Sequence, residues 1–214
     1  MRLARSYRVL NRTTQARLRR LRALGMHALG LAGPEASRLL TYVTLEALNT
    51  WSQFTRYYVL SFGLRPTRCG GGRVSVGRPG VAGPRDVLAI AMRLLRPRTL
   101  PSTTGKWSRR DEPTWHETRS LLECATALNV SNLADIRGAL SIGTRVFLDL
   151  PVFRNFFAHR NDASCSSASA LAISYGIPSG HPSLVLLRKP FKRPWPLLVE
   201  WLDDMAIVTE LLCE

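Results

Sequence analysis

Residues 34–62, PEASRLLTYVTLEALNTWSQFTRYYVLSF, decide the fold. Apolar side chains recur in this stretch at intervals of three and four residues: Leu40, Val43, Ala47, Trp51, Phe54 and Tyr58. An α-helix turns once every ~3.6 residues, so this spacing places all of them on one face. The stretch therefore predicts one long core helix, which is aromatic toward its C-terminal end.

Shorter helical patterns follow toward the C-terminus. Residues 114–117, Thr-Trp-His-Glu, have the Ser/Thr-x-x-Glu form of a capping box and predict a helix start at Thr114. Pro151 predicts a kink or a new first turn. The further helices are expected over Asp86–Leu95, Thr114 to about Asn129, Ser131 or Asn132 to Leu140 and on toward Phe147, Val152–Arg160, Ala163–Tyr175 and Trp195–Leu212.

Three stretches rich in glycine, proline or basic residues predict loops: Gly63–Gly83, Arg96–Pro113 and Gly176–Pro194. Ser183–Leu187 is the only candidate strand. The patterns therefore predict an all-α protein with five or six helices.

The N-terminal residues differ in composition from the rest. Eight arginines lie within the first 24 residues, and the first acidic residue is Glu35. Residues 1–30 are expected to be able to form a basic amphipathic helix. An organelle transit peptide, a flexible basic arm and a start codon assigned too early also fit this composition. We therefore divide the chain into a basic N-terminal extension, residues 1–33, and a helical domain, residues 34–214.

The whole chain has 30 Lys and Arg residues against 15 Asp and Glu, a formal net charge of +15. A surplus of that size favours a polyanionic partner, with nucleic acid first and an anionic membrane surface second. No apolar run approaches the ~20 residues that a membrane span needs. The four cysteines lie far apart and fit reduced thiols, so a cytoplasmic protein is expected.

Common metal and catalytic motifs do not fit the sequence. His116-Glu117 begins like the His-Glu-x-x-His of metalloproteases, but Ser120 stands where the second histidine belongs. The acidic pairs Asp111-Glu112 and Asp203-Asp204 do not supply the several converging carboxylates that metal-dependent nucleases use. We therefore expect neither a metal nor a cofactor.

Residues 151–160, PVFRNFFAHR, place four polar residues among bulky apolar ones. On a helix Asn155 and His159 are one turn apart and share a face, and the long Arg154 side chain can swing toward His159. The apolar residues would anchor the helix. An ordinary surface helix with a buried aromatic side gives the same spacing, so the pattern alone leaves both interpretations open.

These polar residues suit the cleavage of a phosphodiester bond in RNA. Histidine titrates near pH ~6.5 and can take or give a proton at neutral pH. Arginine stays charged and can stabilise the charge that builds on a phosphate in the transition state. Asparagine can orient the imidazole or hold the ribose. A metal is not required when the RNA 2′-hydroxyl is the nucleophile.

The segment Arg154-Asn155-Phe156-Phe157-Ala158-His159 resembles the Arg-x4–6-His signature of HEPN domains, in its Arg-Asn-x-x-Ala-His form. HEPN domains are bundles of four or five helices with a long first helix. Glu35–Phe62 is similar to that first helix, and Trp195–Leu212 is similar to the last. The resemblance implies a HEPN-like bundle with loop insertions, preceded by the basic N-terminal extension.

The resemblance also implies an activity. HEPN nucleases are homodimeric, metal-independent endoribonucleases in which the 2′-hydroxyl attacks the adjacent phosphate and leaves a 2′,3′-cyclic phosphate. On this chain His159 would transfer protons, Arg154 would stabilise the phosphate, and Asn155 would position groups. A toxin–antitoxin or phage-defence role, with a cognate antitoxin protein as partner, is implied as well. The RNA-binding residues are expected to be Arg160, Arg188, Lys189, Lys192 and Arg193.

Two alternatives stay open at this point. One is a catalytically inactive HEPN-like module that binds RNA or a protein. The other is a helical protein attached to an anionic membrane through residues 1–30. A tyrosine two residues after the histidine marks one regulated HEPN subgroup, but Asn161 holds that position here.

Overall fold

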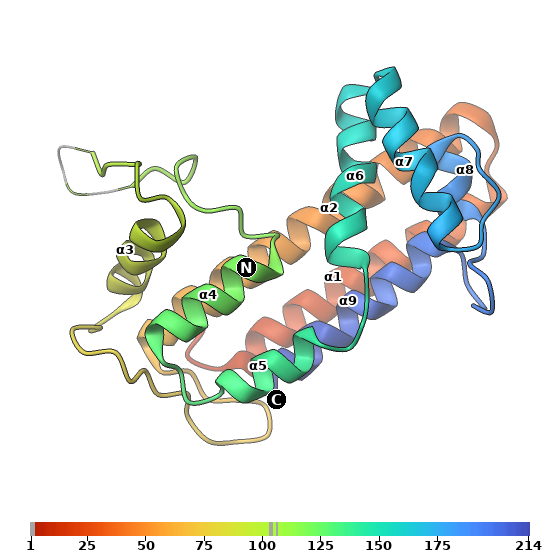
Figure 1. Cartoon of the computed structure of the whole chain (residues 1–214). Coiled ribbons are helices and arrows are strands. Elements are labelled where there is room, and N and C mark those ends of the chain that lie inside the picture. The colour runs from red at the N-terminus through yellow and green to blue at the C-terminus, as the bar shows by residue number, and fades with distance from the viewer. Residues whose placement is uncertain (1–2, 103–104, 106) are drawn as a thin grey trace. The chain divides into compact units, whose positions relative to one another are not determined.

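A computed structural model describes residues 3–102, 105 and 107–214 (Figure 1). Within these residues the regular structure is helical, and backbone pairing of the β type is limited to isolated bridges. The expectation of an all-α protein is therefore confirmed, whereas the expected number of five or six helices is too low, because the described residues form nine α-helices. The described helices are α1 Tyr7–His27, α2 Gly33–Ser61, α3 Pro84–Leu95, α4 Thr118–Leu128, α5 Leu133–Leu140, α6 Val146–His159, α7 Asp162–Ser174, α8 Pro182–Leu187 and α9 Leu197–Cys213, with short 3₁₀ turns η1 Ala28–Gly30 and η2 Phe62–Leu64.

The chain divides into two compact units. Unit 1 contains residues 1–14, 51–143 and 208–214, and unit 2 contains residues 15–50 and 144–207. Helices α1, α2 and α9 contribute residues to both units. The HEPN-like helix bundle that the resemblance implies stays a prediction.

The core of unit 1 is an aromatic stack built on the second half of α2. The Tyr7 and Tyr58 rings are stacked with centroids 4.5 Å apart, and the Phe54 and Tyr58 centroids are 5.7 Å apart. Asn132 donates a hydrogen bond of 3.0 Å to the Tyr58 hydroxyl, which gives that buried polar group a partner. Burial raises the pKa of both tyrosines above the usual value.

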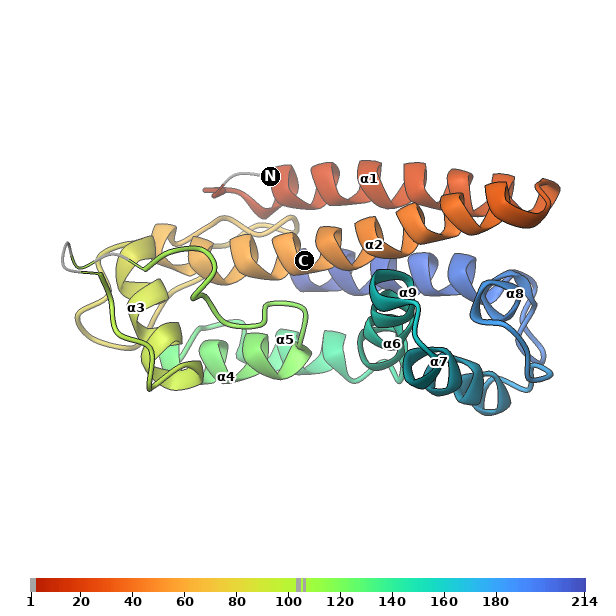
Figure 2. The same ribbon diagram turned by 90° about the horizontal axis from the view of Figure 1, so that it is seen from above.

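Helix α3 contacts η2 and α4. Figures 1 and 2 show α3 near α4. The turn at Gly63 needs glycine, because a Cβ there would lie 2.3 Å from the carbonyl carbon of Gly83. This close approach brings the start of α3 against the end of α2.

The start of α1 and the residues at the end of α9 are hydrogen-bonded to the same loop of unit 1. The backbone amide of Tyr7 donates to the Thr67 carbonyl at 2.9 Å, and the amide of Cys69 donates to the Cys213 carbonyl at 2.8 Å. The Arg68 side chain also donates to the Glu214 carbonyl. Three consecutive residues of the loop thus hold the first turn of α1 and the last residues of the chain.

Helix α1 is a packed element of the fold. Its side chains Tyr7 and Leu10 are buried in unit 1, and Leu18 and Leu21 are buried in unit 2. In unit 2 the Gln15 amide donates to the Ala206 carbonyl of α9 at 2.7 Å. A helix is therefore found within the 1–30 stretch, over Tyr7–His27, and a flexible basic arm does not describe these helical residues.

The core of unit 2 forms where α6 meets α9 and α7. Phe153 of α6 packs edge to face on Trp201 of α9, with centroids 5.4 Å apart. Helix α7 lies beside α6 and α8 (Figure 1), and its small side chains Ala168 and Ala172 are fully buried.

Two helix starts differ from the sequence prediction. Helix α4 begins at Thr118, with Glu117 at its N-cap, so the capping box predicted at Thr114 is wrong. Residues 114–117 form a turn instead, in which the buried Trp115 donates its indole hydrogen to Glu112. Helix α6 begins at Val146 and continues through Pro151, so Phe147 belongs to α6 and the new start expected at Pro151 is wrong.

The candidate strand Ser183–Leu187 is also wrong, because these residues belong to α8. Pro182 occupies the first turn, and the His181 side chain caps the helix by accepting from the Ser183 amide. No helix in the described part of the chain is both long and apolar enough to cross a lipid bilayer.

Candidate functional site

The motif residues lie in the last two turns of α6. Phe153, Phe156 and Phe157 are buried and hold the helix in unit 2. Arg154, Asn155 and His159 are exposed on the same two turns, and Arg160 is exposed at the C-cap. The helix therefore separates an apolar anchor from a polar set that solvent reaches.

Arg154 and Asn155 are in direct contact. The Arg154 guanidinium donates to the Asn155 side-chain oxygen at 3.2 Å. Asn155 and His159 are one turn apart on α6. No hydrogen bond or ion pair joins the His159 imidazole to any side chain among the described residues, so it is open to a ligand. The structure thus joins two of the three motif residues and leaves the third beside them.

The chain turns sharply directly after His159. Arg160 adopts the left-handed conformation with φ 48°, and it donates to the Thr41 hydroxyl at 3.4 Å. Asn161 caps α7 by accepting from the Ser164 amide at 2.8 Å. A non-glycine residue in this conformation carries backbone strain. The turn fixes His159 as the terminal residue of α6.

A buried polar network fixes the start of α6. The Asp149 carboxylate accepts from the Arg145 guanidinium at 2.9 Å and from the Tyr175 hydroxyl at 2.6 Å. The Trp201 indole donates to the Tyr175 hydroxyl at 3.2 Å. Burial and the bond to Asp149 raise the pKa of Tyr175 well above its usual value. The network joins α6, the end of α7 and α9.

Four residues along one face of α6 form a stripe that is apolar at its N-terminal end and polar at its C-terminal end. Leu148, Val152, Asn155 and His159 recur at spacings of four, three and four residues, which places them along one face. Leu148 at the N-terminal end is 70% exposed. The exposed motif residues and an exposed leucine therefore share one face of this helix.

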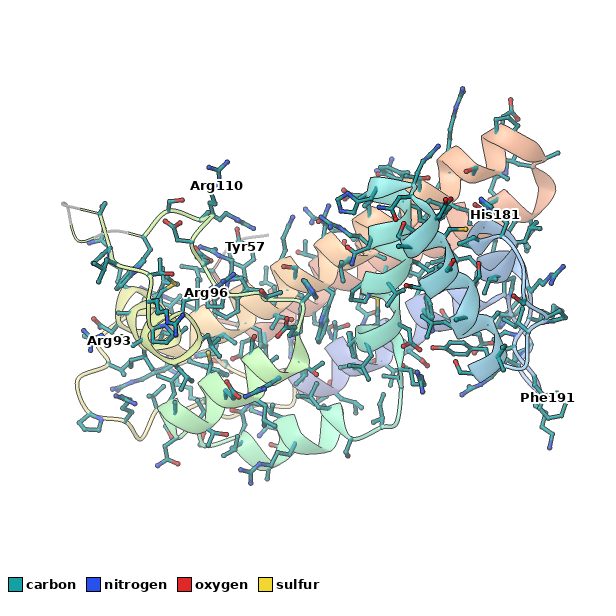
Figure 3. All side chains as sticks on the ribbon, turned by 45° about the horizontal axis from the view of Figure 1, so that its top comes forward. Tyr57, Arg93, Arg96, Arg110, His181 and Phe191 are labelled. Carbon is teal, nitrogen blue, oxygen red and sulfur yellow. The ribbon has the colours of Figure 1, made fainter. Side chains whose placement is uncertain are left out.

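His181 adds a second imidazole next to α6. Its ring lies edge to face against Phe156, with centroids 5.3 Å apart. Because its Nδ1 accepts from the Ser183 amide at 3.3 Å, the neutral ring carries its proton on Nε2. Figure 3 labels His181 in unit 2. Sequence analysis missed this residue, since it lies outside the motif and only the packing of α8 brings it to Phe156.

The basic residues expected to bind RNA all lie in unit 2, but they differ in whether their side chains already contact other residues of the chain. Arg188 donates to the Pro178 carbonyl at 3.0 Å, and Arg193 pairs with Glu200 at 3.6 Å. Lys189 is exposed, and the Lys192 ammonium lies 5.2 Å from the centre of the Phe191 ring. Figure 3 labels Phe191 on this loop.

The described residues contain no group of three or more His, Cys, Asp or Glu side chains that could hold a metal ion. Comparison with family models, with curated proteins and with solved structures finds no match for this chain. The HEPN resemblance therefore rests on the residues of the α6 motif and on the helix pattern.

Proposed function

We propose that this chain is a metal-independent endoribonuclease of the HEPN type, with its catalytic residues at the end of α6. The observation that carries the proposal is the joint exposure of Arg154, Asn155 and His159 on two turns of one anchored helix. Arg154 already contacts Asn155, and the His159 imidazole is open to a ligand. These are the residue types that RNA cleavage through the 2′-hydroxyl needs.

In the proposed reaction His159 takes the proton of the 2′-hydroxyl. The 2′-oxygen forms a bond to phosphorus, the bond from phosphorus to the 5′-oxygen breaks, and the leaving oxygen takes a proton from an acid. Arg154 stabilises the negative charge on the phosphate, held in place by Asn155. The products are a 2′,3′-cyclic phosphate and a 5′-hydroxyl. That acid is a protonated imidazole, which His159 of a second copy supplies in the homodimer proposed below.

The active form is proposed to be a homodimer, which the exposed stripe of α6 supports. Two copies that pack through Leu148 and Val152 would cover the apolar half of the stripe and bring two His159 residues into one cleft. The cellular setting proposed from the resemblance is a cytoplasmic toxin with a cognate antitoxin, or an effector of phage defence.

Incubation of the purified chain with labelled RNA in EDTA tests the proposal. Cleavage is expected to persist in EDTA, to give 2′,3′-cyclic phosphate ends, and to disappear in His159→Ala and Arg154→Ala. His27→Ala is the matched control, because His27 is an exposed histidine on α1. Cleavage that stops in EDTA, or that survives in His159→Ala, would overturn the proposal.

A binding module without catalysis is the second candidate. Among the described residues the Arg154 side chain bonds to Asn155 and forms no hydrogen bond with His159, which favours this candidate. RNA binding that is unchanged in both alanine variants, with no cleavage by the natural chain, would support this candidate instead.

A further inference from the structure

Unit 1 carries more of the positive charge of the chain than unit 2, which contains the α6 motif. Unit 1 contains 18 basic and eight acidic residues, whereas unit 2 contains 12 basic and seven acidic ones. Within unit 1 the sequence between Asp86 and Asp111 has six basic residues and no acidic one. A polyanion that approaches this protein is therefore attracted most strongly to unit 1.

Five of the six basic residues in this stretch are exposed arginines: Arg93, Arg96, Arg98, Arg109 and Arg110. We call them the loop arginines; Lys106, in the same stretch, lies outside the described residues. None of the five forms an ion pair with another described residue. Their guanidinium groups therefore retain their full set of donors for an outside partner.

The nearest buried carboxylate is already neutralised. Glu112 accepts two hydrogen bonds from Arg56, at 2.5 and 2.6 Å, and a third from the Trp115 indole at 2.9 Å. The bond to Glu112 raises the pKa of Arg56. Because Glu112 is buried and saturated, it does not repel an anion at the surface. Three further carboxylates are close: Asp111 is partly exposed, and Glu117 and Glu123 line the same pocket as Arg96.

The same arrangement fixes an aromatic platform beside the loop arginines. The Arg56 guanidinium, held by Glu112, lies 5.3 Å from the centre of the Tyr57 ring. Figure 3 shows Tyr57, Arg96 and Arg110 at the same end of unit 1, with Arg93 on α3. Rings and guanidinium planes are the groups on which unpaired bases stack.

A pocket of about 310 Å³ opens between the end of α3 and α4. Its lining includes Arg96, Thr114, Glu117 and Ser120, together with Arg119 and Glu123, which are paired with each other. Arginine donors suit phosphate, whereas the hydroxyl and carboxylate groups suit ribose hydroxyls and base amino groups. A concave polar pocket of this kind fits nucleotide units better than it fits a flat lipid surface.

We propose that the loop arginines, Tyr57 and this pocket form a binding surface for single-stranded RNA, separate from the cleavage residues of α6. The choice of RNA rests on the proposed function. The surface holds the strand through its phosphates and stacked bases, so it binds without choosing a sequence.

Fluorescence anisotropy with a short labelled oligouridine tests the proposal, in chains that carry His159→Ala to prevent cleavage. The test variant is Arg93→Gln/Arg96→Gln/Arg110→Gln. We expect about fifty-fold weaker binding near ~0.15 M salt, and a slope of log affinity against log salt that is shallower by ~2, because three phosphate contacts are lost. Single Arg96→Gln and Arg110→Gln variants, each expected to lose about fourfold, repeat the test with less change to the surface.

The matched control is Arg73→Gln/Arg85→Gln/Arg137→Gln, which removes the same charge from exposed arginines elsewhere in unit 1. It should weaken binding by less than about threefold, because charges beyond the Debye length are screened. Equal losses in the two triple variants would overturn the proposal. So would a test variant that keeps RNA binding but loses binding to phosphatidylserine vesicles.

The cleavage assay on the natural chain distinguishes a failure of the proposed function from a failure of the proposed binding surface. RNA that binds through the loop arginines but is never cut would refute the proposed function and leave this binding surface supported. Cleavage with full activity and affinity in the test variant would refute the surface alone.

Discussion

The Tyr175 hydroxyl donates a hydrogen bond of 2.6 Å to the buried Asp149 carboxylate, across 26 residues of sequence. This contact joins the residue that follows α7 to the first turn of α6. The motif residues lie on the same helix, so their orientation depends on a carboxylate that is itself out of reach of solvent.

Tyr175→Phe should destabilise the protein by about 1–3 kcal/mol, because the buried Asp149 loses one of its donors and cannot regain it from water. Urea denaturation followed by circular dichroism measures the change. Tyr42→Phe is the matched control, since Tyr42 is exposed, and it should stay within ~0.5 kcal/mol of the natural chain. Equal stabilities for the two variants would mean that the Tyr175 bond contributes nothing to unit 2.

Leu148→Glu should convert the proposed dimer to monomer and abolish RNA cleavage, because a charge would be buried against the second copy. Size-exclusion chromatography with light scattering gives the mass, and the RNA assay gives the activity. Ile173→Glu on α7 is the control, since Ile173 is 73% exposed and lies outside the α6 stripe. A dimer that persists in Leu148→Glu would place the contact elsewhere.

Gly63→Ala should destabilise the protein by about 1–3 kcal/mol, because the new methyl group would overlap the backbone of Gly83 and Pro84. Gly138→Ala, in α5, meets no atom within 4 Å and should stabilise the protein by about 0.5–1 kcal/mol. Thermal unfolding of the two variants gives the comparison. Changes of the same sign would contradict it.

Stability should fall in alkali, because burial raises the pKa of Cys124 to about 12. The unfolded thiol ionises near pH ~8.5, so between there and the folded value only the native state keeps its proton. The contribution of Cys124 is therefore complete below pH ~8.5 and falls by ~1.4 kcal/mol per pH unit above it. The raised pKa of Cys213 acts in the same direction.

Urea unfolding at a series of pH values measures this slope. Cys124→Ala should make it shallower by ~1.4 kcal/mol per pH unit, even if the variant is less stable throughout. Cys165→Ala, at a partly exposed position, provides the comparison. An unchanged slope in Cys124→Ala would show that this thiol ionises as readily in the folded state as in the unfolded one.

The elements that sequence analysis predicted well are those with a long, regular apolar pattern. The stripe from Leu40 to Tyr58 predicted a helix over residues 34–62, and α2 spans Gly33–Ser61. The pattern sufficed because its residues are buried along the whole length of the helix. For the same reason the closing helix, expected over Trp195–Leu212, is found as α9.

The misplaced elements depend on contacts between distant residues. Thr114 does not start a helix, because Trp115 is buried and bonded to Glu112. Helix α6 passes through Pro151 because Asp149, one turn into the helix, is held by Arg145 and Tyr175. The apolar run from Ser183 to Leu187 is short enough to suit a strand as well as a helix.

The residues of the candidate site also fall into two groups: those that a local sequence pattern predicted, and those that depend on contacts between distant residues. A short motif placed Arg154, Asn155 and His159 together on one helix, because neighbours in sequence stay neighbours there. His181 is 25 residues from Phe156 in sequence, and no local pattern could predict that their rings meet. The loop arginines share only a lack of acidic neighbours in sequence, and Tyr57 joins them through Arg56 and Glu112.

The loop from Thr67 to Cys69 binds the first turn of α1 on one side and the last residues of the chain on the other. Residues 5–7 and 213–214 therefore act as structural parts of unit 1. A circular permutant that joins these two segments with a short linker should therefore fold. An insertion that breaks the hydrogen bond between Cys69 and Cys213 should loosen the loop and both segments together.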